Sequence, residues 1–208
     1  MCSSDLLASV GVEVRYRTDP LCADVCRAAG MTPLDVGLCD VGDVDCLVSI
    51  ERPGRAADGR YYTMRGRDIS AWTEPLDEAF VRAGRTGVPT IGVGDGGNEI
   101  GMGKVFERVR ACIPLGETIA CIVPTDRLVV GGVSNWGAWG LAAAVGVLLG
   151  RRLLPTVDEA FRTLAAAVDA GAVDGVTGKP EPTVDGLPWA LHAEILENLL
   201  EIEQRYAG

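Results

Sequence analysis

Short apolar runs alternate with longer amphipathic segments along this chain. The apolar runs predict strands, which cover residues 12–16, 46–50, 88–93, 118–123 and 128–133. The remaining periodic segments predict helices, which cover residues 20–30, 75–83, 136–150, 157–170 and 189–206. Strands that alternate with helices predict an α/β fold with a mostly parallel sheet flanked by helices on both faces, a Rossmann-like three-layer arrangement. The continuous apolar run at 46–50 is typical of a strand buried on both faces.

Polar segments follow three of these strands. They cover residues 51–70, 94–104 and 124–126. Ligands of parallel α/β sheets bind outside the carboxyl ends of the strands, and those ends lie at one edge of the sheet. We therefore expect the three polar segments to gather along that edge.

The segment 92–104, GVGDGGNEIGMGK, holds six glycines in thirteen residues and follows an apolar strand directly. Each glycine lowers the stability of regular structure by roughly 0.5–1 kcal/mol, so this density predicts backbone that turns sharply, takes positive φ or contacts a ligand. The G-x-G-x-x-G pattern is met from Gly92 to Gly97, but the further glycines make a poor start for a helix that binds a pyrophosphate. A Walker loop is disfavoured because Asn98 and Val105 replace residues that it requires.

Three polar residues set among these glycines are the candidates for catalysis: Asp95, Asn98 and Glu99. Two carboxylates four positions apart can face one point and act as general acid and base. Asp95 and Glu99 can equally hold Mg²⁺ or Mn²⁺, which prefer oxygen ligands. The loop glycines are candidates for substrate binding through their N–H groups: Gly94, Gly96 and Gly97. The alternative is a tight turn in which Asp95 and Asn98 cap the next helix.

Arginines crowd the segment 51–70, and four are candidates for binding the carboxylates of a substrate: Arg52, Arg55, Arg65 and Arg67. Guanidinium groups bind carboxylates through paired hydrogen bonds, which suits a small acidic molecule. The alternative is a solvated loop with surface ion pairs, which stabilise a protein little.

A second tight turn, residues 131–136, joins a strand to a helix. Ser134 and Asn135 are candidates for substrate binding there, and either one also suits the position of the helix cap. Backbone N–H groups in such a turn can stabilise an oxyanion. A serine nucleophile is disfavoured because the G-x-S-x-G pattern is absent, and His192, on an amphipathic helix, is more often structural.

Composition limits the ligands and the location of the protein. The 208 residues fit one domain, and the net charge of −10 argues against binding to nucleic acid. This charge is compatible with small carboxylate or phosphate ligands. A homo-oligomer is also possible. The longest apolar helix candidate, 136–150, is too short for a membrane span.

Seven cysteines lie along the chain: Cys2, Cys22, Cys26, Cys39, Cys46, Cys112 and Cys121. The chain has no C-x-x-C pair and a single histidine, so a zinc site is disfavoured. Free cysteines in this number indicate a reducing environment, and we predict a cytoplasmic location.

Four blocks of the sequence resemble the C-terminal domain of the D-glutamate cyclase family. They are GVGDGGNEIGMGK, IERPGRAADGRYYTMRGRDIS before it, VPTD with GGVSNWGAWGL after it, and DGVTGKPEPTVDGLP near the end. The resemblance implies one domain over residues 1–208 and a lyase-type cyclisation of D-glutamate to 5-oxo-D-proline and water. In mitochondrial relatives this domain follows another domain that is also assigned to the cyclase. Family members begin with a further strand and a Gly/Pro-rich loop containing Thr-Asp-Gly that this chain lacks, so we expect an N-terminal truncation.

Such a cyclisation requires a deprotonated amine, a neutralised γ-carboxylate and a stabilised oxyanion. On chemical grounds, Asp95 or Glu99 takes the amine proton and the other assists the loss of water. The candidates for holding the α-carboxylate are Arg55, Arg65 and Arg67. N–H groups of 94–97 or 131–134 are candidates for the oxyanion site. Two other functions stay open: a non-catalytic domain that binds a small carboxylate or nucleotide and regulates a partner, and a dinucleotide-dependent oxidoreductase.

Overall fold

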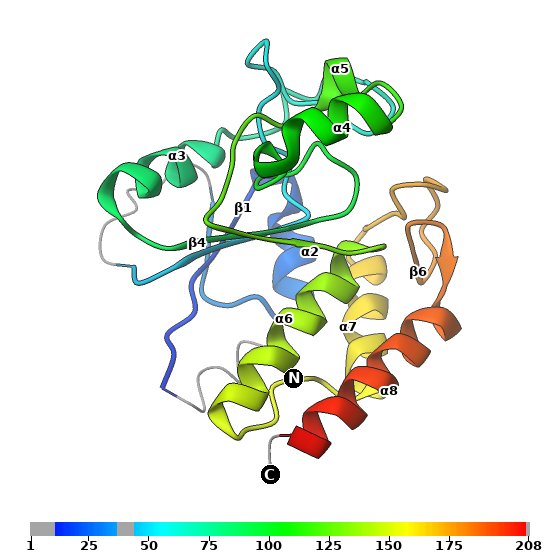
Figure 1. The fold of residues 1–208 in the computed structure, drawn as a ribbon. Coiled ribbons are helices and arrows are strands. Elements are labelled where there is room, and N and C mark those ends of the chain that lie inside the picture. The colour runs from blue at the N-terminus through cyan, green and yellow to red at the C-terminus, as the bar shows by residue number, and fades with distance from the viewer. Residues whose placement is uncertain (1–10, 37–43, 207–208) are drawn as a thin grey trace. The chain divides into compact units, whose positions relative to one another are not determined.

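The computed structural model describes residues 11–36 and 44–206. The chain forms two compact units, one of residues Gly37–Ala138 and the other of Met1–Val36 with Trp139–Gly208. Figure 1 shows the strands and helices of both. The single domain expected over residues 1–208 stays a prediction. The first ten residues, on which the expected truncation depends, and Cys2 and Cys39 lie outside the described residues.

The unit of residues 37–138 is built on a parallel sheet. Its described elements are β3 (Leu47–Ile50), α3 (Asp77–Thr86), β4 (Thr90–Gly94), the short 3₁₀ helix η2 (Gly103–Val105), α4 (Phe106–Cys112), α5 (Gly116–Ile119), β5 (Arg127–Val130) and the start of α6 (Ser134–Leu149). The strand order is β3-β4-β5, and both pairs are parallel. The predicted α/β fold with a mostly parallel sheet is confirmed.

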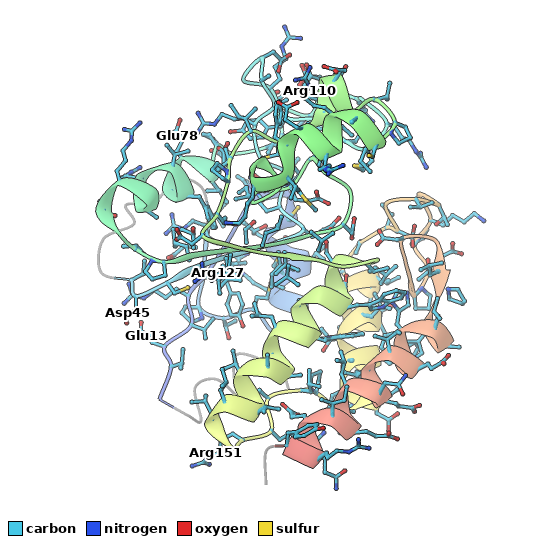
Figure 2. All side chains as sticks on the ribbon, in the orientation of Figure 1. Glu13, Asp45, Glu78, Arg110, Arg127 and Arg151 are labelled. Carbon is cyan, nitrogen blue, oxygen red and sulfur yellow. The ribbon has the colours of Figure 1, made fainter. Side chains whose placement is uncertain are left out.

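Helices cover both faces of this sheet. On one face, Leu47 of β3 and Leu128 of β5 pack into a core that includes Phe80 of α3 and residues of α4. Figure 2 shows the outward-facing side chains of these two helices at Glu78 and Arg110. On the other face, Val93 of β4 lies so close to α6 that a Cβ added at its Gly137 would be 2.9 Å from the valine side chain. The glycine lets the helix approach the strand closely.

Two strand predictions in this unit are wrong. Among the described strands β3 lies at the edge of its sheet rather than buried on both faces, and Val48 and Ile50 are each about half exposed. The run 118–123 is not a strand: α5 ends at Ile119, and residues 120–123, all buried except Ile122, continue in irregular backbone. Short apolar runs fit a buried coil as well as a strand, so their hydrophobicity alone did not separate the two.

The polar segment 124–126 lies at the amino ends of the strands, whereas we expected it at their carboxyl ends. It precedes β5 instead of following a strand, and the N–H and hydroxyl of Thr90, the first residue of β4, donate to the Asp126 carboxylate at 2.8 and 2.9 Å. The segments after β3 and β4 do lie at carboxyl ends, and residues 131–134 follow β5 there.

The unit that contains both chain ends is mostly helical. Its described elements are β1 (Tyr16–Thr18), the 3₁₀ helix η1 (Pro20–Cys22), α2 (Ala23–Ala28), β2 (Leu34–Val36), the rest of α6, α7 (Val157–Asp169), β6 (Thr183–Val184), β7 (Leu187–Pro188) and α8 (Trp189–Tyr206). β1 and β2 are parallel, and β6 and β7 form an antiparallel hairpin. Ala143, Leu154 and Leu196 join α6, α8 and the segment between α6 and α7 in one core. Within residues 11–36 and 44–206, every helix is too short or too polar to cross a lipid bilayer.

Asp174 organises the loop that carries the β6–β7 hairpin. Its buried carboxylate accepts hydrogen bonds from the N–H groups of Val176, Thr177 and Gly186 and from the hydroxyl of Thr183, at 2.7–2.9 Å. Burial acts to raise the pKa of Asp174, but these hydrogen bonds outweigh it and lower the pKa from 3.8 to about 2.

We predict that Asp174→Asn lowers stability at neutral pH and flattens its acid dependence. Because the folded-state pKa is depressed, the stabilisation by the carboxylate is present above the unfolded pKa near 3.8 and is lost as the pH falls towards 2. The difference in melting temperature between wild type and variant should therefore shrink across that window. Thermal unfolding followed by circular dichroism from pH 2 to pH 7 measures it, and a difference that stays constant with pH contradicts the assignment.

Candidate active site

Three carboxylates meet at the carboxyl ends of β3 and β4. Glu51 directly follows β3, Asp95 directly follows β4, and Glu99 lies four residues further on. Each offers an oxygen atom, and these oxygens all lie within 4.8 Å of one another. Glu51 is exposed, Asp95 is half-buried and Glu99 is buried, so the cluster runs from the surface into the protein.

The Glu99 carboxylate is bound by the loop that contains it. It accepts hydrogen bonds from the N–H groups of Asp95, Gly96 and Gly97, at 3.1, 2.7 and 2.6 Å. Only 2% of Glu99 is exposed. A protein carboxylate thus already accepts from these N–H groups, and the oxyanion site expected in this loop stays a prediction.

Close packing of the chain against itself explains the glycines of this loop. A Cβ at Gly92, on β4, would come within 2.8 Å of the backbone of Gly101. Gly97 and Gly101 adopt φ values of 115° and 104°, which other residues rarely take. The loop can therefore fold back over its own strand, which brings Glu99 under the N–H groups of the turn.

The start of α6 binds Asp95. The Ser134 N–H, in the first residue of this helix, donates to Asp95 Oδ2 at 2.6 Å. A carboxylate at a helix N-terminus is stabilised by the helix dipole. Asp95 thus supplies the cap that we expected from Ser134 or Asn135, and it caps α6 rather than the next helix along the chain. Ser134 is buried, and Asn135 is exposed.

Asn98 joins the glycine loop to the arginine-rich segment. Its side-chain amide donates to the Tyr62 carbonyl at 2.7 Å, and its own carbonyl accepts from the Gly54 N–H at 2.9 Å. Ile100 N–H donates to the Arg52 carbonyl beside it, at 2.8 Å. These contacts give Asn98 a structural task, and its catalytic role stays a prediction.

Two of the four candidate arginines contact the start of α3 and the segment just before it. Arg55 Nε donates to the fully buried Asp77 at 2.7 Å, and the Tyr61 hydroxyl donates to the same carboxylate at 2.7 Å. Burial and the bond to Asp77 raise the pKa of Tyr61. Arg52 donates to the Glu74 carbonyl at 2.6 Å.

The other two candidate arginines, Arg65 and Arg67, are exposed. The Arg67 guanidinium stacks over the Trp72 ring, 5.0 Å from its centroid. Contacts with residues 72–77 therefore help to hold the arginine-rich segment, and ligand binding by its arginines stays a prediction.

Glu51 is the member of the cluster that the sequence did not reveal. It adopts a φ of 56°, a left-handed conformation that a non-glycine residue takes at a cost of order 1–3 kcal/mol. Its one signal was its position as the first residue after an apolar run, where parallel α/β sheets place binding groups.

The chemistry of the cluster favours a cation. Three carboxylates within 4.8 Å of one another repel each other, and a positive group between them relieves that repulsion. An ammonium group or a hard divalent cation such as Mg²⁺ or Mn²⁺ matches this set of oxygen donors.

Comparison with known proteins gave two matches. The family model described as "D-glutamate cyclase-like, C-terminal" matches residues 4–200. The Homo sapiens protein named "D-glutamate cyclase, mitochondrial" is 39% identical over 195 residues, covering 79% of this chain and 32% of that protein. The chain thus spans about a third of the length of this relative. Since the relative is named mitochondrial, the cytoplasmic location stays a prediction.

We predict that Asp77→Asn lowers the free energy of unfolding by about 2 kcal/mol or more, because it removes a buried charge that binds Arg55 and Tyr61. Asp68→Asn is the matched control. Its ion pair with Arg60, at 3.8 Å, joins side chains that are both about half exposed, and we expect a change below about 1 kcal/mol. Urea unfolding of both variants measures the difference. Equal losses of unfolding free energy would show that the Asp77 contacts stabilise the fold no more than an exposed ion pair does.

We predict that the two loop carboxylates contribute unequally to stability. Glu99→Gln replaces an accepting oxygen with an amide that cannot accept a hydrogen bond, so it should cost about 1–3 kcal/mol. Asp95→Asn keeps an oxygen for the Ser134 N–H and should cost less than about 1 kcal/mol. Melting curves of the two variants test this, and an Asp95→Asn protein that melts as low as Glu99→Gln contradicts it.

Proposed function

Because the chain belongs to the D-glutamate cyclase-like C-terminal family, we propose that it carries out a cyclase reaction, the conversion of D-glutamate to 5-oxo-D-proline and water. The protein is then a lyase acting on a small acidic amino acid. The observation that carries the proposal is the convergence of Glu51, Asp95 and Glu99 at the carboxyl ends of β3 and β4.

The proposed reaction forms one bond and breaks another. The amine nitrogen of the substrate attacks its γ-carboxyl carbon, a C–N bond forms, and a C–O bond breaks to release water. Two protons leave the nitrogen and two reach the departing oxygen, so groups that accept and return protons accelerate both halves. The α-ammonium group is the positive group that the three carboxylates attract.

We assign a role to each of the three carboxylates from its hydrogen bonds and its burial. Glu99 is bound to three N–H groups, so we assign it the task of holding the loop. Asp95 is half-buried, and Glu51 is exposed beside it. These two are assigned the transfer of protons from the amine to the departing oxygen. Arg55, fixed at Nε by Asp77 and still partly exposed, is the first candidate for the α-carboxylate.

A divalent cation fits the same oxygens. Glu51, Asp95 and Glu99 would hold Mg²⁺ or Mn²⁺, and a cation there would polarise the γ-carboxyl group. The ammonium group of the substrate and the metal are alternatives for the cluster, and a metal titration separates them.

The contacts of the glycine loop weaken the support for the oxidoreductase. A pyrophosphate would need the N–H groups that Glu99 occupies and a long helix after the loop, whereas the loop continues into η2, a 3₁₀ helix of three residues. A non-catalytic domain that binds a small carboxylate stays the second candidate, because the arginine-rich segment borders the glycine loop through Asn98.

We predict that the protein forms 5-oxoproline from D-glutamate and less or none from L-glutamate. Asp95→Asn should lose at least about 100-fold of the turnover, the lower range for a general acid–base group, while the fold is kept. Chromatography of the product, with chelator and with added Mn²⁺ or Mg²⁺, measures both the reaction and its metal requirement. Binding of D-glutamate without product in every condition would support the non-catalytic domain instead.

A further inference from the structure

Ser134 carries a buried hydroxyl group for which the described part of the chain provides no hydrogen-bond partner. The residue is 1% exposed, and its Oγ is fully buried. Buried hydroxyls are almost always paired, because an unpaired one costs about 1–3 kcal/mol of desolvation. An unpaired hydroxyl in a native protein therefore requires an explanation, and a ligand that pairs with it is one.

The position of Ser134 places this hydroxyl beside the carboxylate cluster. Its N–H donates to Asp95 Oδ2 at 2.6 Å. In a helix, the N–H and Cα–Cβ bonds both tilt towards the N-terminus, so the side chain of the first residue of α6 leans to the end where Asp95 lies. Two carbon atoms separate this hydroxyl oxygen from the backbone nitrogen that binds Asp95.

Two opposite potentials adjoin at this point. The carboxylates of Glu51, Asp95 and Glu99 attract a positive group, and the N-terminus of the sixteen-residue helix α6 favours a negative one. A zwitterion whose ammonium group must approach its own carboxylate matches this pair. The hydroxyl of Ser134 lies on the helix side of the boundary and can donate one hydrogen bond.

We propose that the Ser134 hydroxyl donates a hydrogen bond to the γ-carboxyl oxygen of the substrate, the oxygen on which negative charge develops when the amine attacks. This inference rests on the proposed function. It makes Ser134 a catalytic residue that donates to the substrate without becoming a nucleophile, and it requires substrate binding to displace the groups that cover this hydroxyl. The backbone N–H of the same residue positions Asp95. Ser134 would thus act on the γ-carboxyl group directly and on the amine through Asp95.

The inference predicts that stability and activity respond in opposite ways. Ser134→Ala removes a hydroxyl that has no partner in the described chain, so the variant should melt at the same temperature as the wild type or higher. Its kcat should fall about 100- to 1,000-fold, the loss typical of one oxyanion donor, with a smaller change in KM. Ser134→Thr keeps a hydroxyl and should retain more activity than Ser134→Ala.

Ser49→Ala is the matched control. Ser49 lies on β3, is 4% exposed, and also has a buried hydroxyl that lacks a partner among the described residues. Because it lies within the strand and not at the start of α6, its loss should leave kcat within about twofold of the wild type. If the loss of any buried hydroxyl lowered activity, kcat would fall equally in Ser49→Ala and Ser134→Ala.

The outcomes separate the inference from the proposed function. If the wild type forms no 5-oxoproline from D-glutamate, the proposed function fails. If the wild type is active and Ser134→Ala keeps its kcat, the inference alone is overturned. A fall in melting temperature of more than about 5 °C for Ser134→Ala also overturns it, because the hydroxyl would then have a partner within the protein. An unchanged melting temperature with a large loss of kcat, absent in Ser49→Ala, supports it.

Discussion

The buried carboxylate of Glu99 holds the glycine loop in the shape on which the candidate site depends. Its hydrogen bonds to three successive N–H groups fix the turn after β4, and that turn sets where Asp95 lies. Asp95 in turn binds the first residue of α6. The loop, the sheet edge and the helix are thus joined by two carboxylates that act as hydrogen-bond acceptors. In this arrangement the anion that a glycine-rich turn attracts comes from the protein itself.

Long periodic segments were predictable from the sequence. α8 covers the predicted 189–206, and α7 begins at the predicted Val157, because many positions contribute to the pattern of a long helix. The run 118–123 has too few positions to distinguish a strand from buried coil. Because we predicted a strand there, we also placed residues 124–126 at the wrong end of the strands. Asp95 and Glu99 were predictable as a pair within one loop. Glu51 was not, since its approach to them depends on the parallel pairing of β3 with β4.

The electrostatic character of the site differs from the one that the arginines suggested. Those residues pointed to a site for anions, and Arg55 and Arg67 proved to contact Asp77 and Trp72, which follow their segment in the chain. The sheet edge instead presents three acidic groups. In a protein with a net charge of −10, an anionic ligand would be repelled at long range and would need local donors to hold it. The start of α6 and the exposed arginines are the local groups that can do this.

The close approach of Gly92 to the chain that folds over it affects how a mutational scan of this protein should be interpreted. Adding one carbon at position 92 forces the backbone of residues 100–101 away from β4, which displaces Glu99 without touching any reacting atom. Intolerance of substitution at the loop glycines would therefore report on chain packing. Intolerance would carry information about the ligand at positions such as 51 and 95, whose carboxylates form the cluster, and at 134, for which we propose a contact with the substrate. In such a scan, many of the positions that tolerate no substitution would thus be glycines needed for packing, and few would be residues that contact a ligand.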